Sequence, residues 1–145
     1  VFDKFNRDES KVIPALIRRV IEKQNPIEVW GNGKDLKDFL YIDDFIDALI
    51  KVSFNNNDTG TVNIASGKSI SIKTILKKIL KIEKLKSKVY FDSSKPTLIP
   101  RRSINIEKLK KNYAWKQKID LDKGLTKTIQ WYKKYYKKKS PEEIE

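Results

Sequence analysis

The chain has 145 residues, of which 39% are hydrophobic and 35% are charged, and its formal net charge is +13. This length fits one domain with an ordinary core, and the apolar content is too high for a disordered chain. Cysteine and histidine are absent, which excludes disulfides, thiolate catalysis and histidine-based metal or acid–base sites. No apolar run approaches the ~20 residues of a membrane span, and no signal peptide is recognisable, so we expect a cytoplasmic protein.

The positive charge raises the question of a polyanionic partner. Only five of the 32 basic residues are arginine, and the lysines are scattered except over residues 77–88 and 133–139. Lysines spread over solvated faces favour solubility and indicate nothing about the fold. We therefore expect no nucleic-acid and no membrane partner, and an RNA-binding basic protein stays open as a rival interpretation.

The first elements of the chain are predicted from apolar periodicity. Residues 10–24 have the spacing of an amphipathic helix, which Ser10 can cap and which tolerates Pro14 in its first turn. A strand over residues 27–30 follows. The Gly-Asn-Gly of residues 31–33 is typical of a tight hairpin turn and leads into the next strand.

That second strand is predicted over residues 39–42. Asp43 or Asp44 is expected to cap the next helix, over residues 44–54. The pattern predicts a buried stripe on this helix, formed by Phe45, Ala48, Leu49 and Val52.

The centre of the chain alternates strands and helices. Residues 61–65 alternate poorly, as strands buried on both faces do. Ser71 opens a helix over residues 71–82, whose apolar face is formed by Ile72, Ile75, Leu76 and Ile79. A strand over residues 88–92 and an extended loop over residues 93–102 follow.

The last part of the chain is predicted to be helical. Residues 105–113 indicate a short helix, and residues 121–136 indicate a longer one that buries Leu121, Leu125, Ile129 and Tyr132. The residues beyond form a charged tail. Strands that alternate with helices in this way indicate the α/β class, without an internal repeat or a dividing linker.

Most catalytic arrangements are missing from the sequence. No Gly-rich phosphate-binding loop exists, and Asp43, Asp44 and Asp47 are better explained as helix-start residues than as a metal cluster. Tyr135 and Lys139 have a Tyr-x-x-x-Lys spacing, but in so lysine-rich a tail this match is expected by chance.

Two basic sites stand out from the scattered lysines. One is Lys37, which lies between the 31–33 turn and the next predicted strand. The other is Arg101-Arg102, in a Pro-bounded loop that also contains Lys95. Arginine binds phosphate with two parallel hydrogen bonds, and Trp30 offers an aromatic face nearby, so these residues fit a nucleoside diphosphate. A core tryptophan with solvated cations is an equally good explanation from spacing alone.

Several blocks of sequence occur in the order known from one family. Residues 5–19 read FNRDESKVIPALIRR, and residues 29–44 contain Trp-Gly-Asn-Gly followed by Lys-Asp-Phe-Leu-Tyr-Ile-Asp-Asp. Residues 62–72 contain Val-Asn-Ile-Ala-Ser-Gly and Ile-Ser-Ile, while residues 113–132 contain Tyr-Ala-Trp and Trp-Tyr. These blocks resemble the C-terminal half of the extended short-chain dehydrogenase/reductases, the NAD-dependent epimerase/dehydratase family. Residues 92–102 are similar to its GDP-L-fucose synthase-like members.

The resemblance implies a particular domain organisation. Residues 1–136 would form the small mixed α/β substrate-binding portion of a Rossmann-type enzyme, and residues 137–145 its charged tail. The strand over residues 61–65 would be an edge element of the dinucleotide-domain sheet. The NAD(P)-binding glycines, the catalytic Ser/Thr and the Tyr-x-x-x-Lys would precede Val1, which agrees with the absence of methionine from the chain.

The resemblance also implies a set of site residues. The expected substrate contacts are Lys11, Arg19, Trp30, Lys37, Lys95, Arg101 and Arg102. Lys11 stands where the fucose synthases have a catalytic histidine, and Lys37 replaces the usual arginine. No catalytic, cofactor-binding or metal-binding residue is expected within this chain.

By the same resemblance, the intact protein is expected to be an NAD- or NADP-dependent enzyme that acts on a nucleoside-diphosphate sugar. Epimerisation, dehydration and reduction all stay open, as does a fucose synthase-like activity. The intact enzyme is expected to be a homodimer, and the 145-residue chain alone to be inactive. The alternative is a non-catalytic module that binds a nucleotide or a polyanion.

Overall fold

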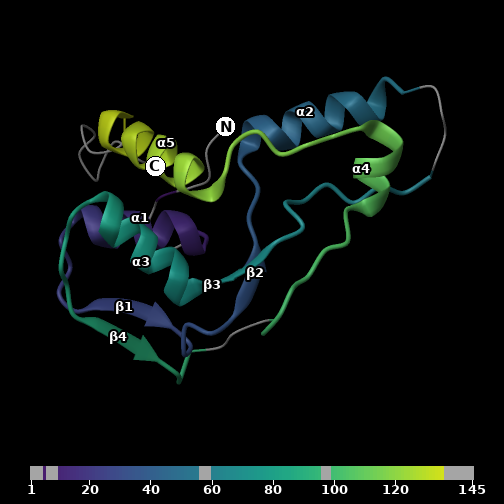
Figure 1. The fold of residues 1–145 in the computed structure, drawn as a ribbon. Coiled ribbons are helices and arrows are strands. Elements are labelled where there is room, and N and C mark those ends of the chain that lie inside the picture. The colour runs from purple at the N-terminus through teal and green to yellow at the C-terminus, as the bar shows by residue number, and fades with distance from the viewer. Residues whose placement is uncertain (1–4, 6–9, 56–59, 96–98, 136–145) are drawn as a thin grey trace.

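The computed structural model describes residues 5, 10–55, 60–95 and 99–135 of the chain. One half of the molecule is a layer of helices over a parallel pair of strands (Figure 1). Its elements are α1 (Val12–Ile21), β1 (Ile27–Trp30), α3 (Ile72–Ile82), β4 (Val89–Asp92) and α5 (Leu121–Tyr135). In the parallel pair, Ile27 lies opposite Val89 and Trp30 lies opposite Asp92.

The other half is built around two helices and is joined to the first by a short antiparallel ladder. Its elements are β2 (Leu36–Asp38), α2 (Ile42–Ser53), β3 (Ser69–Ser71) and α4 (Glu107–Tyr113). Figure 1 shows α2 and α4 on the far side of β2 and β3 from the α1–α3–α5 layer.

The prediction for α3 is confirmed in detail. Ser71 is the N-cap, and its hydroxyl accepts a hydrogen bond from the backbone N–H of Thr74 at 3.2 Å. All four predicted apolar residues of this helix are buried against α1 and α5. This helix is therefore specified by its own cap and its own periodicity.

Helix α1 is shorter than the predicted 10–24. Lys11 occupies the N-cap position without a side-chain hydrogen bond, so the proposed Ser10 cap is wrong. The helix ends at Ile21 because the next residues turn away, with Lys23 at a positive φ of 57°. Pro14 does lie in the first turn, as expected.

The predicted strand over residues 39–42 is wrong. The strand lies earlier, at β2, and residues 39–41 are irregular before α2 begins at Ile42. Phe39 is nevertheless partly buried, because it packs against the core that α1, β1, α3 and α5 share. Its apolar neighbourhood thus reflects tertiary packing and not strand pairing.

The proposed caps of α2 are also wrong. Tyr41 is the N-cap, and no side chain caps the helix. Asp43 and Asp44 lie within its first turn, where negative charge suits the helix dipole. Asp44 is buried and accepts hydrogen bonds from the backbone N–H groups of Lys118 at 3.2 Å and Ile119 at 2.9 Å. Its role is to tie α2 to the segment that enters α5.

The turn at residues 31–33 does not form a hairpin. It connects β1 of the parallel pair to β2 of the antiparallel ladder. Gly33 has a φ of 71°, and a Cβ atom there would lie 2.3 Å from Cε1 of Phe91. The glycine is needed because the turn passes directly against the Phe91 ring.

The buried stripe predicted for α2 is right for Ala48 and for the partly buried Val52, and wrong for the other two residues. Ala48 is fully buried, but Phe45 is 39% and Leu49 is 45% exposed. Residues 61–65, predicted as a strand, have no strand partner in the described part of the chain. Ala65 is buried, and Val62 and Ile64 pack against the same core cluster, so this segment contributes to the core without strand pairing.

The core consists of two clusters. The first joins α1, β1, α3 and α5 and includes Phe5, which stacks on Tyr132 at a ring-centroid distance of 4.6 Å. The second lies between α2, α4 and residues 62–65, around Leu109 and Trp115. The charged tail over residues 137–145 lies outside the described residues.

Candidate functional site

The carboxyl ends of β1 and β4 bring Trp30 and Lys95 together. The two strands run in parallel, and Trp30 lies opposite Asp92, after which the chain turns through Ser94. The carboxylate of Asp92 accepts hydrogen bonds from the Ser94 N–H at 3.0 Å and hydroxyl at 2.6 Å. This turn places the Lys95 ammonium 5.7 Å from the centroid of the Trp30 ring, which is 54% exposed.

Hydrogen bonds to Ser94 lower the pKa of Asp92 below its ordinary value, against the opposing effect of desolvation. The same hydrogen bonds hold the turn that carries Lys95. The Trp30 ring and the Lys95 ammonium form a solvent-exposed surface at the carboxyl end of the parallel pair of strands.

The second group of predicted residues lies along β2. Leu36 is bridged in parallel to Arg101, because its N–H donates to the Pro100 carbonyl at 2.8 Å and its carbonyl accepts from the Arg102 N–H at 2.9 Å. The Lys37 ammonium donates to the carbonyl of Ile99. The fold thus brings Lys37 next to the Arg101-Arg102 pair, which is 64 residues away in the sequence.

The two arginines are not equivalent in this arrangement. Residues paired in a parallel ladder share a face, and successive side chains alternate between faces. Arg101 therefore shares the face of Leu36, and we expect Arg102 to follow on the face of Lys37. Both arginines are exposed, and no ion pair holds either of them within the described residues.

Arg19 and Lys11 are placed differently. The Arg19 guanidinium donates to the backbone carbonyl of Glu28 at 2.5 Å and lies 3.6 Å from the Glu28 carboxylate. Desolvation lowers the Arg19 pKa, and the nearby Glu28 carboxylate opposes that shift. Arg19 thus ties α1 to β1, whereas Lys11 is exposed at the N-cap of α1. Their roles in substrate binding stay predictions.

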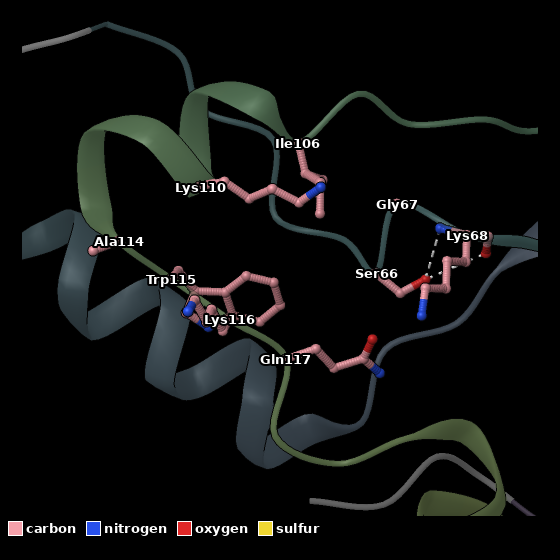
Figure 2. Close-up of a pocket in the computed structure, with 9 residues that line it drawn as sticks. All are labelled: Ser66, Gly67, Lys68, Ile106, Lys110, Ala114, Trp115, Lys116 and Gln117. Atoms are coloured by element: carbon pink, nitrogen blue, oxygen red, sulfur yellow. Dashed lines mark hydrogen bonds between the residues drawn. The ribbon is translucent and has the colours of Figure 1, made fainter.

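A pocket lies on the α4 side of the loop that precedes β3 (Figure 2). It has a volume of about 540 Å³ and is lined by residues 66–68, residues 114–117 and two residues of the α4 region. Trp115 and Ile106 supply apolar walls, and Lys68, Lys110 and Lys116 lie around them. None of the sequence-predicted site residues lines it. Three rim lysines are unremarkable in a chain with this lysine content, so the pocket does not define a ligand.

The structure gives no catalytic or metal-binding role to the aspartates of α2 or to Tyr135. No group of three potential ligands in the described residues could hold a metal ion. Asp44 is committed to backbone N–H groups, and Asp47 accepts from the Lys118 ammonium at 2.7 Å. Tyr135 is half exposed at the end of α5, and Lys139 lies outside the described residues. In the part of the chain that is described, no helix is long and apolar enough to cross a membrane.

Comparison with known proteins agrees with the expected resemblance. Residues 2–65 match the NAD dependent epimerase/dehydratase family. The chain is 37% identical over 134 residues to a probable GDP-L-fucose synthase 1 of Oryza sativa subsp. japonica, covering 90% of this chain and 40% of that protein. It is 33% identical over 143 residues to the GDP-L-fucose synthase of Escherichia coli, covering 90% of this chain and 44% of the relative.

Solved structures share the fold. A GDP-L-fucose synthetase from Naegleria fowleri, also solved bound to NADP, superposes with a TM-score of 0.84 at 22% identity, over 94% of this chain and 43% of that one. A dTDP-glucose 4,6-dehydratase from Bacillus anthracis, in complex with NAD, gives 0.80 at 22% identity over 93% and 42%.

The match over residues 2–65 and the curated relatives confirm the expected resemblance to the extended short-chain dehydrogenase/reductases of the NAD-dependent epimerase/dehydratase family. Within that family it is similar in particular to the GDP-L-fucose synthases. The α/β fold class expected from the sequence is confirmed as well. The chain spans about two fifths of the length of the curated relatives it matches.

Proposed function

We propose that the protein containing this chain converts a nucleoside-diphosphate sugar, and that this chain supplies its substrate clamp. The observation that carries the proposal is the arrangement along β2, where an isolated bridge at Leu36 holds the Arg101-Arg102 pair beside Lys37. These cations neutralise the diphosphate, and the arginines can bind its oxygens in a bidentate manner. The exposed Trp30 ring, with Lys95 above it, provides a packing face for the base or sugar.

Similarity to GDP-L-fucose synthases favours a GDP-sugar as the substrate, and a fucose synthase-like activity with it. Lys11 in place of a catalytic histidine argues against full 3,5-epimerisation of that substrate. A sugar 4-epimerase, a 4,6-dehydratase and a 4-reductase are therefore alternatives of equal weight to a fucose synthase.

The hydride chemistry of such an enzyme needs NAD or NADP, which solved structures of the same fold contain. The described residues offer no site for the pyrophosphate of a dinucleotide. The first N–H groups of α3, the helix beside the 31–33 turn, are already satisfied by the carbonyls of Gly33 and Asp35 and by Ser71. No helix N-terminus at a glycine turn is thus open to a pyrophosphate in the described residues. The cofactor belongs on a preceding dinucleotide-binding part.

A preceding dinucleotide-binding part also explains why apolar side chains of α2 are exposed in this chain. We propose that residues 1–136 are the substrate-binding portion and residues 137–145 a charged tail. The preceding Rossmann part would cover the exposed side of α2 and pair with residues 61–65 at its sheet edge. Phe45, Leu49 and the 82% exposed Phe54 support this, since a large apolar surface left in water is unfavourable. The complete enzyme would be a cytoplasmic homodimer, associated through that preceding part.

Substitution of the clamp residues tests the proposal in the complete protein. Arg101→Ala and Arg102→Ala should each weaken GDP-sugar binding, by about 1.5–3 kcal/mol for the one that contacts the diphosphate. Lys37→Arg should be tolerated, because it preserves the charge and adds the bidentate geometry. Unchanged affinity in both arginine variants, together with lost activity in Lys37→Arg, would show that the clamp is wrongly placed.

Two further measurements separate the rival functions. Residues 1–145 alone should show no turnover of nucleotide sugars with NAD or NADP, and turnover would place an active site within this chain. Binding of GDP should weaken only modestly between about 50 and 200 mM salt, whereas an RNA or polyanion binder would lose affinity by orders of magnitude.

A further inference from the structure

Ser69 lies beside the proposed clamp but was not recognised in the sequence. It is the first residue of β3 and lies opposite Asp38 in the antiparallel ladder. Its hydroxyl donates a hydrogen bond of 2.7 Å to the backbone carbonyl of Arg102. The Arg102 N–H is bound to the Leu36 carbonyl, so both polar groups of the Arg102 backbone are held.

The loop that leads into Ser69 is held in place by its own hydrogen bonds. The Asp38 carboxylate accepts a hydrogen bond of 2.8 Å from the N–H of Ser66, which holds the loop before β3 against β2. The Ser66 hydroxyl in turn accepts from the Lys68 N–H at 3.1 Å. The loop from Ser66 to Ser69 is therefore braced at both ends before it reaches Arg102.

The Arg101-Arg102 segment has few other restraints. It is joined to β2 by one isolated bridge, and it follows residues 96–98, which lie outside the described part of the chain. Both arginine side chains are exposed. The position of the Arg102 guanidinium thus depends on how its backbone is held.

We propose that Ser69 is a positioning residue, which holds the Arg102 backbone so that its side chain works with Lys37 on the phosphates. This inference rests on the proposed function, because it assumes that Arg102 binds the diphosphate. Ser69 itself touches no substrate. It acts by preorganisation, since the hydrogen bond fixes the backbone before the ligand arrives and lowers the entropy cost of binding.

The test compares Ser69→Ala with Ser69→Thr, which retains the hydroxyl, in the complete protein. Thr126→Ala is the matched control, because its hydroxyl also donates to a backbone carbonyl, that of Asp122 at 2.8 Å, in α5. Titration calorimetry with GDP and with guanosine measures binding, and amide hydrogen exchange at Arg102 reports on the backbone directly.

Ser69→Ala should weaken GDP binding about three- to tenfold, the effect of one neutral hydrogen bond, and should leave guanosine binding unchanged. The Arg102 amide should exchange at least about tenfold faster. Ser69→Thr should restore both values, and Thr126→Ala should change neither. A general loss of structure would weaken guanosine as much as GDP, and this outcome would overturn the positioning role.

Arg102→Ala separates the inference from the proposed function. If Arg102→Ala weakens GDP binding while Ser69→Ala does not, the positioning role is wrong and the clamp stands. If Arg102→Ala leaves GDP binding unchanged, the Arg102 part of the clamp is wrong, and the role of Ser69 falls with it. Unchanged exchange of the Arg102 amide in Ser69→Ala would refute the inference by itself.

Discussion

Replacement of Asp44 by alanine should destabilise the protein far more than replacement of its neighbour Asp43. Asp44 is 2% exposed, and its carboxylate oxygens each accept one backbone N–H, from Lys118 and from Ile119. The Asp43 side chain is 60% exposed and lies 3.8 Å from the ammonium of Lys127. The two substitutions remove the same charge from the same helical turn.

The expected magnitudes follow from these environments. Two hydrogen bonds to a charged acceptor are together worth about 3–6 kcal/mol, and the longer bond to Lys118 places Asp44→Ala near the lower end, about 3–4 kcal/mol. Alanine would also leave two N–H groups without an acceptor. The exposed pair of Asp43 is worth only about 0–1 kcal/mol.

Urea denaturation followed by circular dichroism measures both free energies of unfolding. Asp44→Asn is a useful intermediate, because the amide retains one acceptor oxygen and should recover part of the loss. Equal effects of Asp43→Ala and Asp44→Ala, each near 1 kcal/mol, would mean that the two residues act as ordinary helix-start charges and that the Asp44 tie contributes nothing.

Two other substitutions test the turn and the surface ion pairs. Gly33→Ala should cost about 2–4 kcal/mol, because its Cβ would meet the Phe91 ring. Gly60→Ala, with a similar φ of 64° and only the flexible Lys108 ammonium at 4.0 Å from the added Cβ, should cost only the backbone strain. Thermal unfolding compares the two variants, and equal losses would contradict the packing argument. The bond to Lys118 lowers the pKa of Asp47, so the pair contributes stability above the unfolded pKa and loses it as the pH falls through the folded value. Unfolding free energies of wild type and Asp47→Asn should therefore differ above about pH 5 and converge as the pH falls below the folded-state pKa of Asp47, and a difference that persists once Asp47 is protonated would refute this.

Local signals predicted the elements that are specified by their own caps, turns and apolar spacing. Helix α3 has its cap at Ser71 and its apolar residues at regular spacing, so the sequence was sufficient. Strand β1 likewise lies between turn residues on both sides. In these places the propensity, the pattern and the final packing agree.

The incorrect predictions concern features that depend on distant residues. The three-residue ladder of β2 and β3 is too short to give a pattern, and it is fixed by long-range pairing. The partners of Asp44 lie 74 and 75 residues away, so its local environment indicated only a cap. The amphipathic pattern of α2 correctly indicated an apolar face, but periodicity does not indicate which surface covers that face.

The site was partly predictable for the same reason. Rarity of arginine drew attention to Arg101-Arg102, and the turn drew attention to Lys37, but their adjacency needed the bridge at Leu36. Ser69 gave no signal, because a serine before a short apolar stretch is common. Arg19 was marked as a substrate contact, and its engagement with Glu28 could not be read from spacing.

The two core clusters are built from stretches of sequence that alternate along the chain. The first takes residues 5–29, 70–91 and 121–132, and the second takes residues 40–65 and 104–115 in between. Neither cluster can be cut out as a continuous piece, because every excision removes residues that the other needs. Gene fusions or domain exchanges that divide this chain internally would therefore separate residues that share a core. A fusion junction placed before residue 5 would instead leave both clusters whole.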